Sequence, residues 1–106
     1  MKNLEPYFPV TVTARHMDCT ESIRHYAETR LARIHLKYPR ITSAKVIVDN
    51  QKHGQKAEII LTCTNHIVIE ADTETSDLYE AIDLTIEKVE RKMRKEKTKR
   101  QKRLGH

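Results

Sequence analysis

The spacing of apolar residues changes along this chain of 106 residues, and the order of these spacings limits the possible folds. Alternation predicts a strand over 8–15, and apolar residues at helical spacing then predict a helix over 21–37. Three further alternating segments precede a last helix, which is capped by Thr75 or Ser76 and extends to about Lys97. The predicted order of elements is therefore β-α-β-β-β-α.

Each predicted helix has a single apolar face, so each should pack against the rest of the protein on that face and expose its other side to solvent. The first two strands are joined by a helix and can pair in parallel, whereas short turns between the last three predict an antiparallel meander. The predicted fold class is α+β. It is a two-layer sandwich with both helices on one face of a four-stranded sheet, as in a double-stranded-RNA-binding domain. We expect residues 1–97 to form this single domain and residues 98–106 to form a disordered basic tail.

Basic residues are concentrated near the end of the chain. Residues 88–103 contain ten Lys and Arg against two Glu, a net charge of +8. The remaining 90 residues contain 10 basic and 13 acidic residues, a net charge of −3, so that the whole chain carries +5. This asymmetry favours a polyanionic partner, although a solvated helix that only aids solubility would have the same composition.

The charges of the last predicted helix are separated by sign around its axis. Four bases lie on one flank of its apolar stripe: Lys88, Arg91, Lys92 and Lys95. Three acids lie on the other side: Asp83, Glu87 and Glu90. A helix that used only i,i+4 ion pairs would mix the signs more evenly, although Glu87 and Arg91 have that spacing.

The first predicted helix has a similar basic flank, which contains Tyr26, Arg30, Arg33 and Lys37. Two such helices side by side could present a basic groove between or beside them, suited to the phosphates of RNA. Structured RNA is favoured over single strands, because only one aromatic residue lies in these stripes. Whether the two stripes face the same way stays open. The candidate RNA-binding residues are Arg30, Arg33, Lys37, Lys88, Arg91, Lys92 and Lys95.

The sequence predicts neither an enzyme nor a metal or cofactor site. His16 and Cys19 lack the close ligand pairs of zinc sites, and His16 would contact phosphate or cap its loop. Cys63 falls on an inward strand position, which indicates a buried structural thiol. Only two glycines are present, so no glycine-rich phosphate loop exists. Without a membrane span or signal peptide in the sequence, we expect a cytoplasmic protein with no membrane partner and no small-molecule substrate.

The outer face of the predicted sheet carries three apolar residues, Ile47, Ile60 and Val68. They could form a patch for weak homo-association, or they could be scattered surface residues without a role. They motivate an alternative function, a protein-interaction module that regulates transcription or self-associates through the open sheet face.

Four segments resemble a known family. The segments Thr13–Glu21 (TARHMDCTE) and Tyr26–Arg33 (YAETRLAR) resemble the opening of the ribosome hibernation promoting factors. This family includes the ribosome-associated inhibitor and the proteins once called sigma-54 modulation proteins. The segments Asp77–Leu84 (DLYEAIDL) and Lys88–Lys95 (KVERKMRK) resemble the family's final helix.

The resemblance implies a short family member that binds the small ribosomal subunit and its rRNA. Family members lie in the channel between head and body, over the mRNA and tRNA sites, and silence idle ribosomes in stationary phase or stress. Their rRNA contacts come from basic residues of both helices, which correspond to the seven candidates above. Long members carry a second domain that pairs ribosomes, so whether this chain promotes ribosome dimers or only inactivates single ribosomes stays open.

Overall fold

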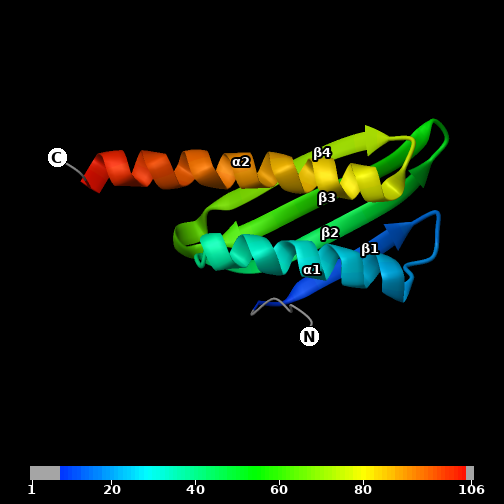
Figure 1. Cartoon of the computed structure of the whole chain (residues 1–106), viewed down its shortest axis with the longest axis horizontal. Helices are drawn as coiled ribbons and strands as arrows, with labels where there is room; N and C mark the ends of the chain where they lie inside the picture. The colour runs from blue at the N-terminus through cyan, green and yellow to red at the C-terminus, as the bar shows by residue number, and fades with distance from the viewer. Residues whose placement is uncertain (1–7, 105–106) are drawn as a thin grey trace.

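A computed structural model describes residues 8–104 of the chain and the side chains of residues 8–96. The elements follow the predicted order (Figure 1). They are β1 (Val10–Arg15), α1 (Glu21–Lys37), β2 (Ile41–Gln51), β3 (Gly54–Cys63), a 3₁₀ turn (Thr64–His66), β4 (Val68–Thr75) and α2 (Leu78–Leu104).

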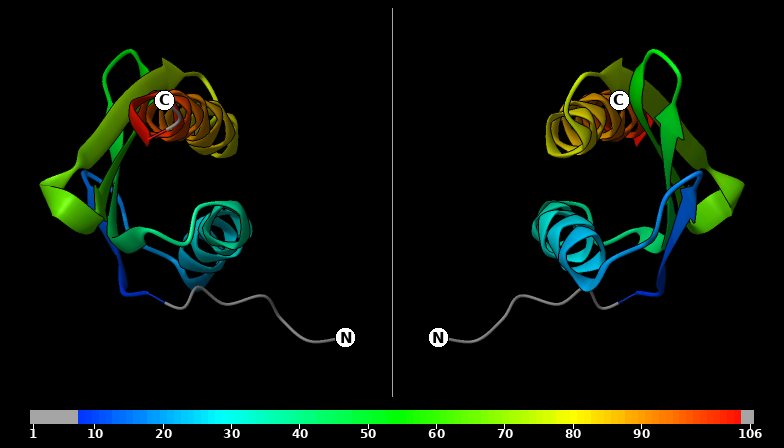
Figure 2. Two further views of the ribbon diagram at one scale, coloured as in Figure 1. Left: turned by 90° about the vertical axis from the view of Figure 1, so that its left-hand side faces the viewer. Right: turned by 90° about the vertical axis from the view of Figure 1, so that its right-hand side faces the viewer.

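The strands form one four-stranded sheet in the order β1-β2-β3-β4. β1 is parallel to β2, and the β2–β3 and β3–β4 pairs are antiparallel. Both helices lie on one face of the sheet, side by side, as the end views show (Figure 2). α2 packs against β3 and β4, and α1 lies on the β1 side. The predicted two-layer α+β sandwich is confirmed.

The first helix has the boundaries that the sequence predicts. Thr20 caps its N-terminus, because the Thr20 hydroxyl oxygen accepts a hydrogen bond from the backbone N–H of Ile23 at 3.2 Å. The helix ends at Lys37, just before Pro39, whose ring disfavours helical backbone in the preceding residue. Its buried stripe, which includes Ala27 and Leu31, packs into the core.

The core lies between the sheet and the helices. Alternate residues of β2 and β3 face it, among them Val46, Val48, Ile59 and Leu61, all fully buried. Thr85 of α2 is the buried polar residue of this layer within the described part of the chain. Its hydroxyl donates to the carbonyl oxygen of Ala81 at 2.7 Å and lies 3.2 Å from that of Ala57 in β3. Because the Thr85 hydroxyl is hydrogen-bonded, it can be buried where α2 packs directly against the sheet.

The last helix differs from the sequence prediction at its far end. α2 continues to Leu104, whereas the sequence predicted a helix to Lys97 and a tail without regular structure from Thr98. Residues 98–104 are mostly Lys, Arg and Gln, which favour helix, and the next glycine is Gly105. Side chains from Lys97 onward and residues 105–106 lie outside the described part of the chain, and the domain boundary at residue 97 stays a prediction.

The expected apolar patch on the open sheet face is not continuous. Ile47 is only 7% exposed, because it lies on the inner strand β2 with Thr13 of β1 and Glu58 of β3 as its neighbours across the sheet. Ile60 is half-buried, and Val68 is 55% exposed. The expectation that Ile47 is available at the surface is therefore wrong, and self-association through this face stays a prediction.

Candidate nucleic-acid interface

The four bases predicted on one flank of α2 do lie together. Lys88, Arg91, Lys92 and Lys95 line a groove of about 520 Å³ along the outer edge of the sheet, with Glu58, Glu70, Ala71 and Asp72 on the strand side. The groove forms because the buried stripe of α2 packs on β3 and β4, which turns this flank of the helix toward β4. Within the described part of the chain, this outer groove holds the largest group of predicted RNA-binding residues.

Two of these lysines are engaged with the backbone of β4. The Nζ of Lys88 donates to the carbonyl oxygen of Asp72 at 2.8 Å, and the Nζ of Lys92 donates to that of Glu70 at 2.6 Å. β4 is an edge strand, so alternate carbonyls along it have no strand partner. Lys88 and Lys92 therefore cap the exposed edge of the sheet.

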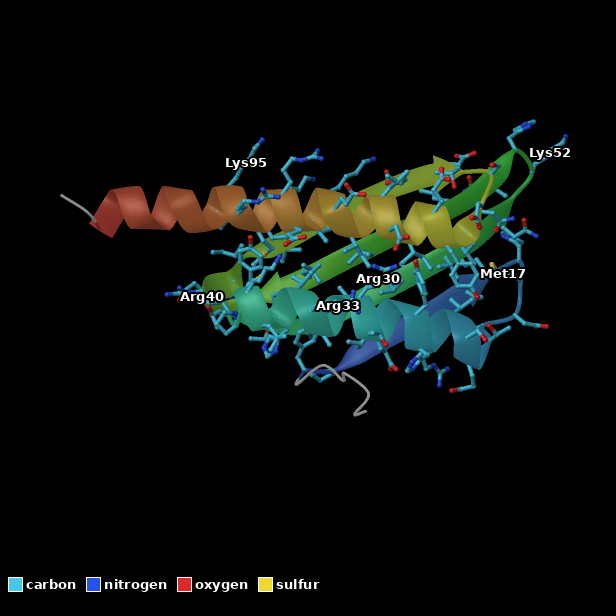
Figure 3. All side chains as sticks on the ribbon, in the orientation of Figure 1. Met17, Arg30, Arg33, Arg40, Lys52 and Lys95 are labelled. Atoms are coloured by element: carbon cyan, nitrogen blue, oxygen red, sulfur yellow. The ribbon has the colours of Figure 1, made fainter. Side chains whose placement is uncertain are left out.

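The other two cations of this flank are available to a ligand. Arg91 and Lys95 are exposed, and neither makes a hydrogen bond or an ion pair with any residue that the structure describes. The i,i+4 pair between Glu87 and Arg91, which their spacing allowed, is not formed. Figure 3 shows Lys95 on the side of α2 that faces away from α1.

The basic flank of α1 faces the acidic side of α2 rather than its basic flank. Arg30, Arg33 and Lys37 line a second groove, of about 350 Å³, between the two helices, opposite Asp83, Glu87 and Glu90 of α2. Figure 3 shows Arg30 and Arg33 on the side of α1 toward α2. The two predicted basic stripes thus lie on different sides of α2, a separation that the sequence could not decide.

Two of the three cations in the inter-helix groove form ion pairs with carboxylates of α2. The Nε of Arg30 lies 3.4 Å from the carboxylate of Asp83, and the Nζ of Lys37 lies 3.2 Å from that of Glu90. Arg33 is exposed and has no such partner among the described residues. Because the groove has equal numbers of cations and carboxylates, its local charge is near zero.

An aromatic cluster joins the two helices beside these ion pairs, and sequence reasoning missed it. The Tyr26 hydroxyl lies 2.8 Å from both carboxylate oxygens of Asp83 and accepts a hydrogen bond from Arg30 at 2.8 Å. The Arg30 guanidinium lies 4.8 Å from the Tyr26 ring centre, and the Tyr79 ring meets that ring edge-on at 4.9 Å. Burial, followed by the hydrogen bond to Asp83, raises the pKa of Tyr26. The signal was present in the i,i+4 spacing of Tyr26 and Arg30.

His16 contacts a carboxylate rather than a free anion site. His16 follows β1 directly, and its Nδ1 lies 2.8 Å from the carboxylate of Asp49 in β2. The His16 backbone has a positive φ of 59°. The hydrogen bond from His16 holds the pKa of Asp49 below its ordinary value. Asp49 also accepts a hydrogen bond from Gln51 at 3.3 Å. Among the described residues no cluster of His, Cys, Asp and Glu could hold a metal ion.

Cys63 is buried, as the sequence predicts, and its sulfur lies 3.8 Å from that of Met93 in α2. Burial raises the pKa of the Cys63 thiol, with a smaller effect from Glu96. A thiol with a raised pKa is a poor nucleophile, so the structure gives Cys63 a packing role. No helix within the described residues is long and apolar enough to cross a membrane.

These features define a small α+β protein with a groove along the outer flank of its longer helix, in which four cations outnumber three carboxylates. The family model described as "Sigma 54 modulation protein / S30EA ribosomal protein" matches residues 10–101. The chain belongs to this family, and the resemblance seen in the sequence is confirmed.

Curated relatives and solved structures agree with this assignment. The chain is 36% identical to a ribosome hibernation promoting factor from Azotobacter vinelandii over 90 residues, which cover 85% of this chain and 83% of that protein. It is 34% identical to one from Pseudomonas putida over 92 residues, covering 87% and 89% of the two chains.

Two solved structures have the same fold. A ribosomal subunit interface protein from Coxiella burnetii superposes with a TM-score of 0.79 at 23% identity, covering 86% of this chain and 99% of that one. The N-terminal domain of Protein Y from Thermus thermophilus gives a TM-score of 0.73 at 26% identity, covering 86% and 97%.

Proposed function

We propose that this protein binds the small ribosomal subunit and keeps idle ribosomes inactive by occupying the mRNA and tRNA channel. It acts as a cytoplasmic translation inhibitor during stationary phase or stress, without catalysing a reaction. The names of its relatives, which are ribosome hibernation promoting factors, support the ribosome as its partner. The path through the channel and the residues that contact rRNA are part of the proposal.

The main support for this function is that Arg91 and Lys95 are exposed and available to bind a ligand. Both are exposed on the outer groove of α2 without a partner among the described residues, so neither must break an internal contact before it binds phosphate. Arg offers paired donors to a phosphate and Lys a single strong charge. We therefore expect these two residues to contribute most of the phosphate contacts made by α2.

Four of the other five candidate residues must first break an existing hydrogen bond or ion pair before they can contact RNA. Lys88 and Lys92 would have to release backbone carbonyls of β4. Arg30 and Lys37 would have to leave their ion pairs with α2, whereas Arg33 is available. The single substitution Arg33→Gln should thus reduce subunit binding more than Lys37→Gln.

Co-sedimentation with isolated small subunits tests the proposal. The double variant Arg91→Glu, Lys95→Glu should lose most of its binding at moderate salt, because repulsion replaces two phosphate contacts. The matched control is Lys45→Glu, Lys52→Glu, which makes the same charge change at two exposed residues. Lys45 lies on β2, and Lys52 lies in the β2–β3 turn (Figure 3). The control variant should sediment with the subunits almost as well as the wild type.

A competition assay tests the position on the subunit. Wild-type protein should reduce binding of a short mRNA and of tRNA to small subunits, and the Arg91→Glu, Lys95→Glu variant should not. Wild-type protein that binds the subunits at saturation and leaves mRNA and tRNA binding unchanged would place it outside the channel. Equally weakened sedimentation of the variant and its control would show that net charge alone governs binding.

A further inference from the structure

In the inter-helix groove, two charged residues without a described partner lie between two ion pairs. α1 and α2 run in the same direction (Figure 1), so the paired residues advance together along both helices. Arg30 pairs with Asp83, and Lys37 pairs with Glu90 further along. Between these pairs, Arg33 and Glu87 line the same groove. Both are exposed, and neither has a hydrogen-bond or ion-pair partner among the described residues.

The groove is unsuited to a phosphate. Its three cations are matched by three carboxylates, so an anion that reached Arg33 would lie among Asp83, Glu87 and Glu90. Repulsion from these carboxylates would offset the attraction of Arg33. The groove instead favours a neutral ligand that accepts hydrogen bonds on one side and donates them on the other.

The base of the groove is apolar. Ile34 of α1 and Ile86 of α2 line it, and both side chains are almost fully buried. Because the protein itself already covers these two side chains, they close the floor of the groove. A planar ring that lies on this floor would meet Arg33 and Glu87 with its edge. The groove, of about 350 Å³, lies within the usual size range of small-ligand sites.

We infer that this groove holds one unpaired nucleobase with an exocyclic amino group, and that cytosine fits it. The cytosine amino group donates to the Glu87 carboxylate, and the ring carbonyl at the other end of the same edge accepts from the Arg33 guanidinium. Uracil has a carbonyl in place of that amino group, so it would place an acceptor against Glu87. The inference rests on the proposed function as an RNA-binding protein, and it assigns base recognition to the inter-helix groove and phosphate binding to the outer groove.

The test uses two RNA stem-loops that have the same stem and differ only in the loop, which is made of cytidines or of uridines. Binding is followed by fluorescence anisotropy at fixed salt. The wild type should bind the cytidine loop at least about five-fold more tightly than the uridine loop, the lower end of what a good base contact contributes. Glu87→Ala should reduce that ratio to about one.

The matched control is Glu80→Ala, which removes the same charge from an exposed residue in the first turn of α2, outside the groove. It should keep the wild-type ratio. The inference is wrong if the wild type does not distinguish the loops, or if Glu87→Ala strengthens binding of both loops equally, since Glu87 would then only repel phosphate.

The same preparations separate this inference from the proposed function. Normal co-sedimentation with small subunits, combined with equal binding of the two loops, would overturn the base site and leave the ribosomal function in place. Failure to bind both the subunits and either stem-loop would overturn the proposed function and the base site together.

Discussion

The Tyr26 hydroxyl donates to the carboxylate of Asp83 at 2.8 Å and so joins α1 to α2 across 57 positions of sequence. Arg30 completes the contact, because it donates to the Tyr26 oxygen and lies 3.4 Å from the same carboxylate. This contact fixes the two helices side by side at one end of the inter-helix groove. It therefore determines where the remaining charged residues of that groove, Arg33 and Glu87, stand relative to each other.

Removing the Tyr26 hydroxyl should destabilise the protein. We expect Tyr26→Phe to lower the free energy of unfolding by about 1 kcal/mol, the usual contribution of one hydrogen bond. Tyr79→Phe is the matched control, because the Tyr79 hydroxyl has no partner among the described residues. Urea denaturation measures both variants. Equal stability of Tyr26→Phe and the wild type would show that the contact between the helices contributes nothing.

The same contact predicts a loss of stability in alkali. Folding raises the pKa of Tyr26, so its contribution is fully present below the unfolded pKa of about 10 and is lost as the pH rises through the higher folded pKa. Thermal unfolding between about pH 9 and 12 should show a steeper loss of stability in the wild type than in Tyr26→Phe. If the stability of the wild type and that of Tyr26→Phe fell equally with pH, the loss would not come from ionisation of Tyr26.

Acid should affect the pair formed by His16 and Asp49. The pKa of Asp49 is lowered in the folded state, so its contribution is present above the unfolded pKa of about 3.9 and is lost as the pH falls through the folded pKa. His16→Gly removes the ring and keeps the positive φ without strain. An NMR titration of the Asp49 carboxyl group should show a higher pKa in this variant than in the wild type. An unchanged pKa would mean that the hydrogen bond from His16 is not its cause.

The lysines at the edge of β4 should limit self-association. Lys88→Met, Lys92→Met keeps the side-chain stems but exposes the carbonyls of Asp72 and Glu70, which become available to another strand. Sedimentation velocity at increasing concentration should show more association for this variant than for the wild type. Arg91→Met, Lys95→Met removes the same charge without exposing the edge and should remain like the wild type. Equal association of the two variants would assign the effect to charge.

The sequence predicted the fold well because its apolar spacing is regular. The stripe of α1 and the Thr20 cap defined that helix, and all four strands were found in the predicted order. The burial of Ile47 was not predictable from alternation, because it depends on neighbours from β1 and β3 that meet it only in the folded sheet. The length of α2 was underestimated, because a lack of apolar residues does not prevent a run of strong helix formers from staying helical.

The candidate site was predictable in part. A helical wheel groups Lys88, Arg91, Lys92 and Lys95 because this grouping depends on one helix alone, and the structure places them in one groove. The partners of the α1 stripe depend on how two helices pack, which no single-helix pattern contains. The sequence therefore could not show that Arg30 and Lys37 face acids of α2, while Arg33 has no ion-pair partner among the residues that the structure describes.

The dependence of small-subunit binding on salt tests the central claim most directly, namely that Arg91 and Lys95 bind rRNA phosphates. The measurement is the slope of the logarithm of affinity against the logarithm of salt concentration. For Arg91→Gln, Lys95→Gln the slope should become shallower by about two, roughly one for each cation that no longer neutralises a phosphate. Lys45→Gln, Lys52→Gln, with the same charge change, should keep the wild-type slope. An unchanged slope in the first variant, or an equal change in both, would contradict the claim.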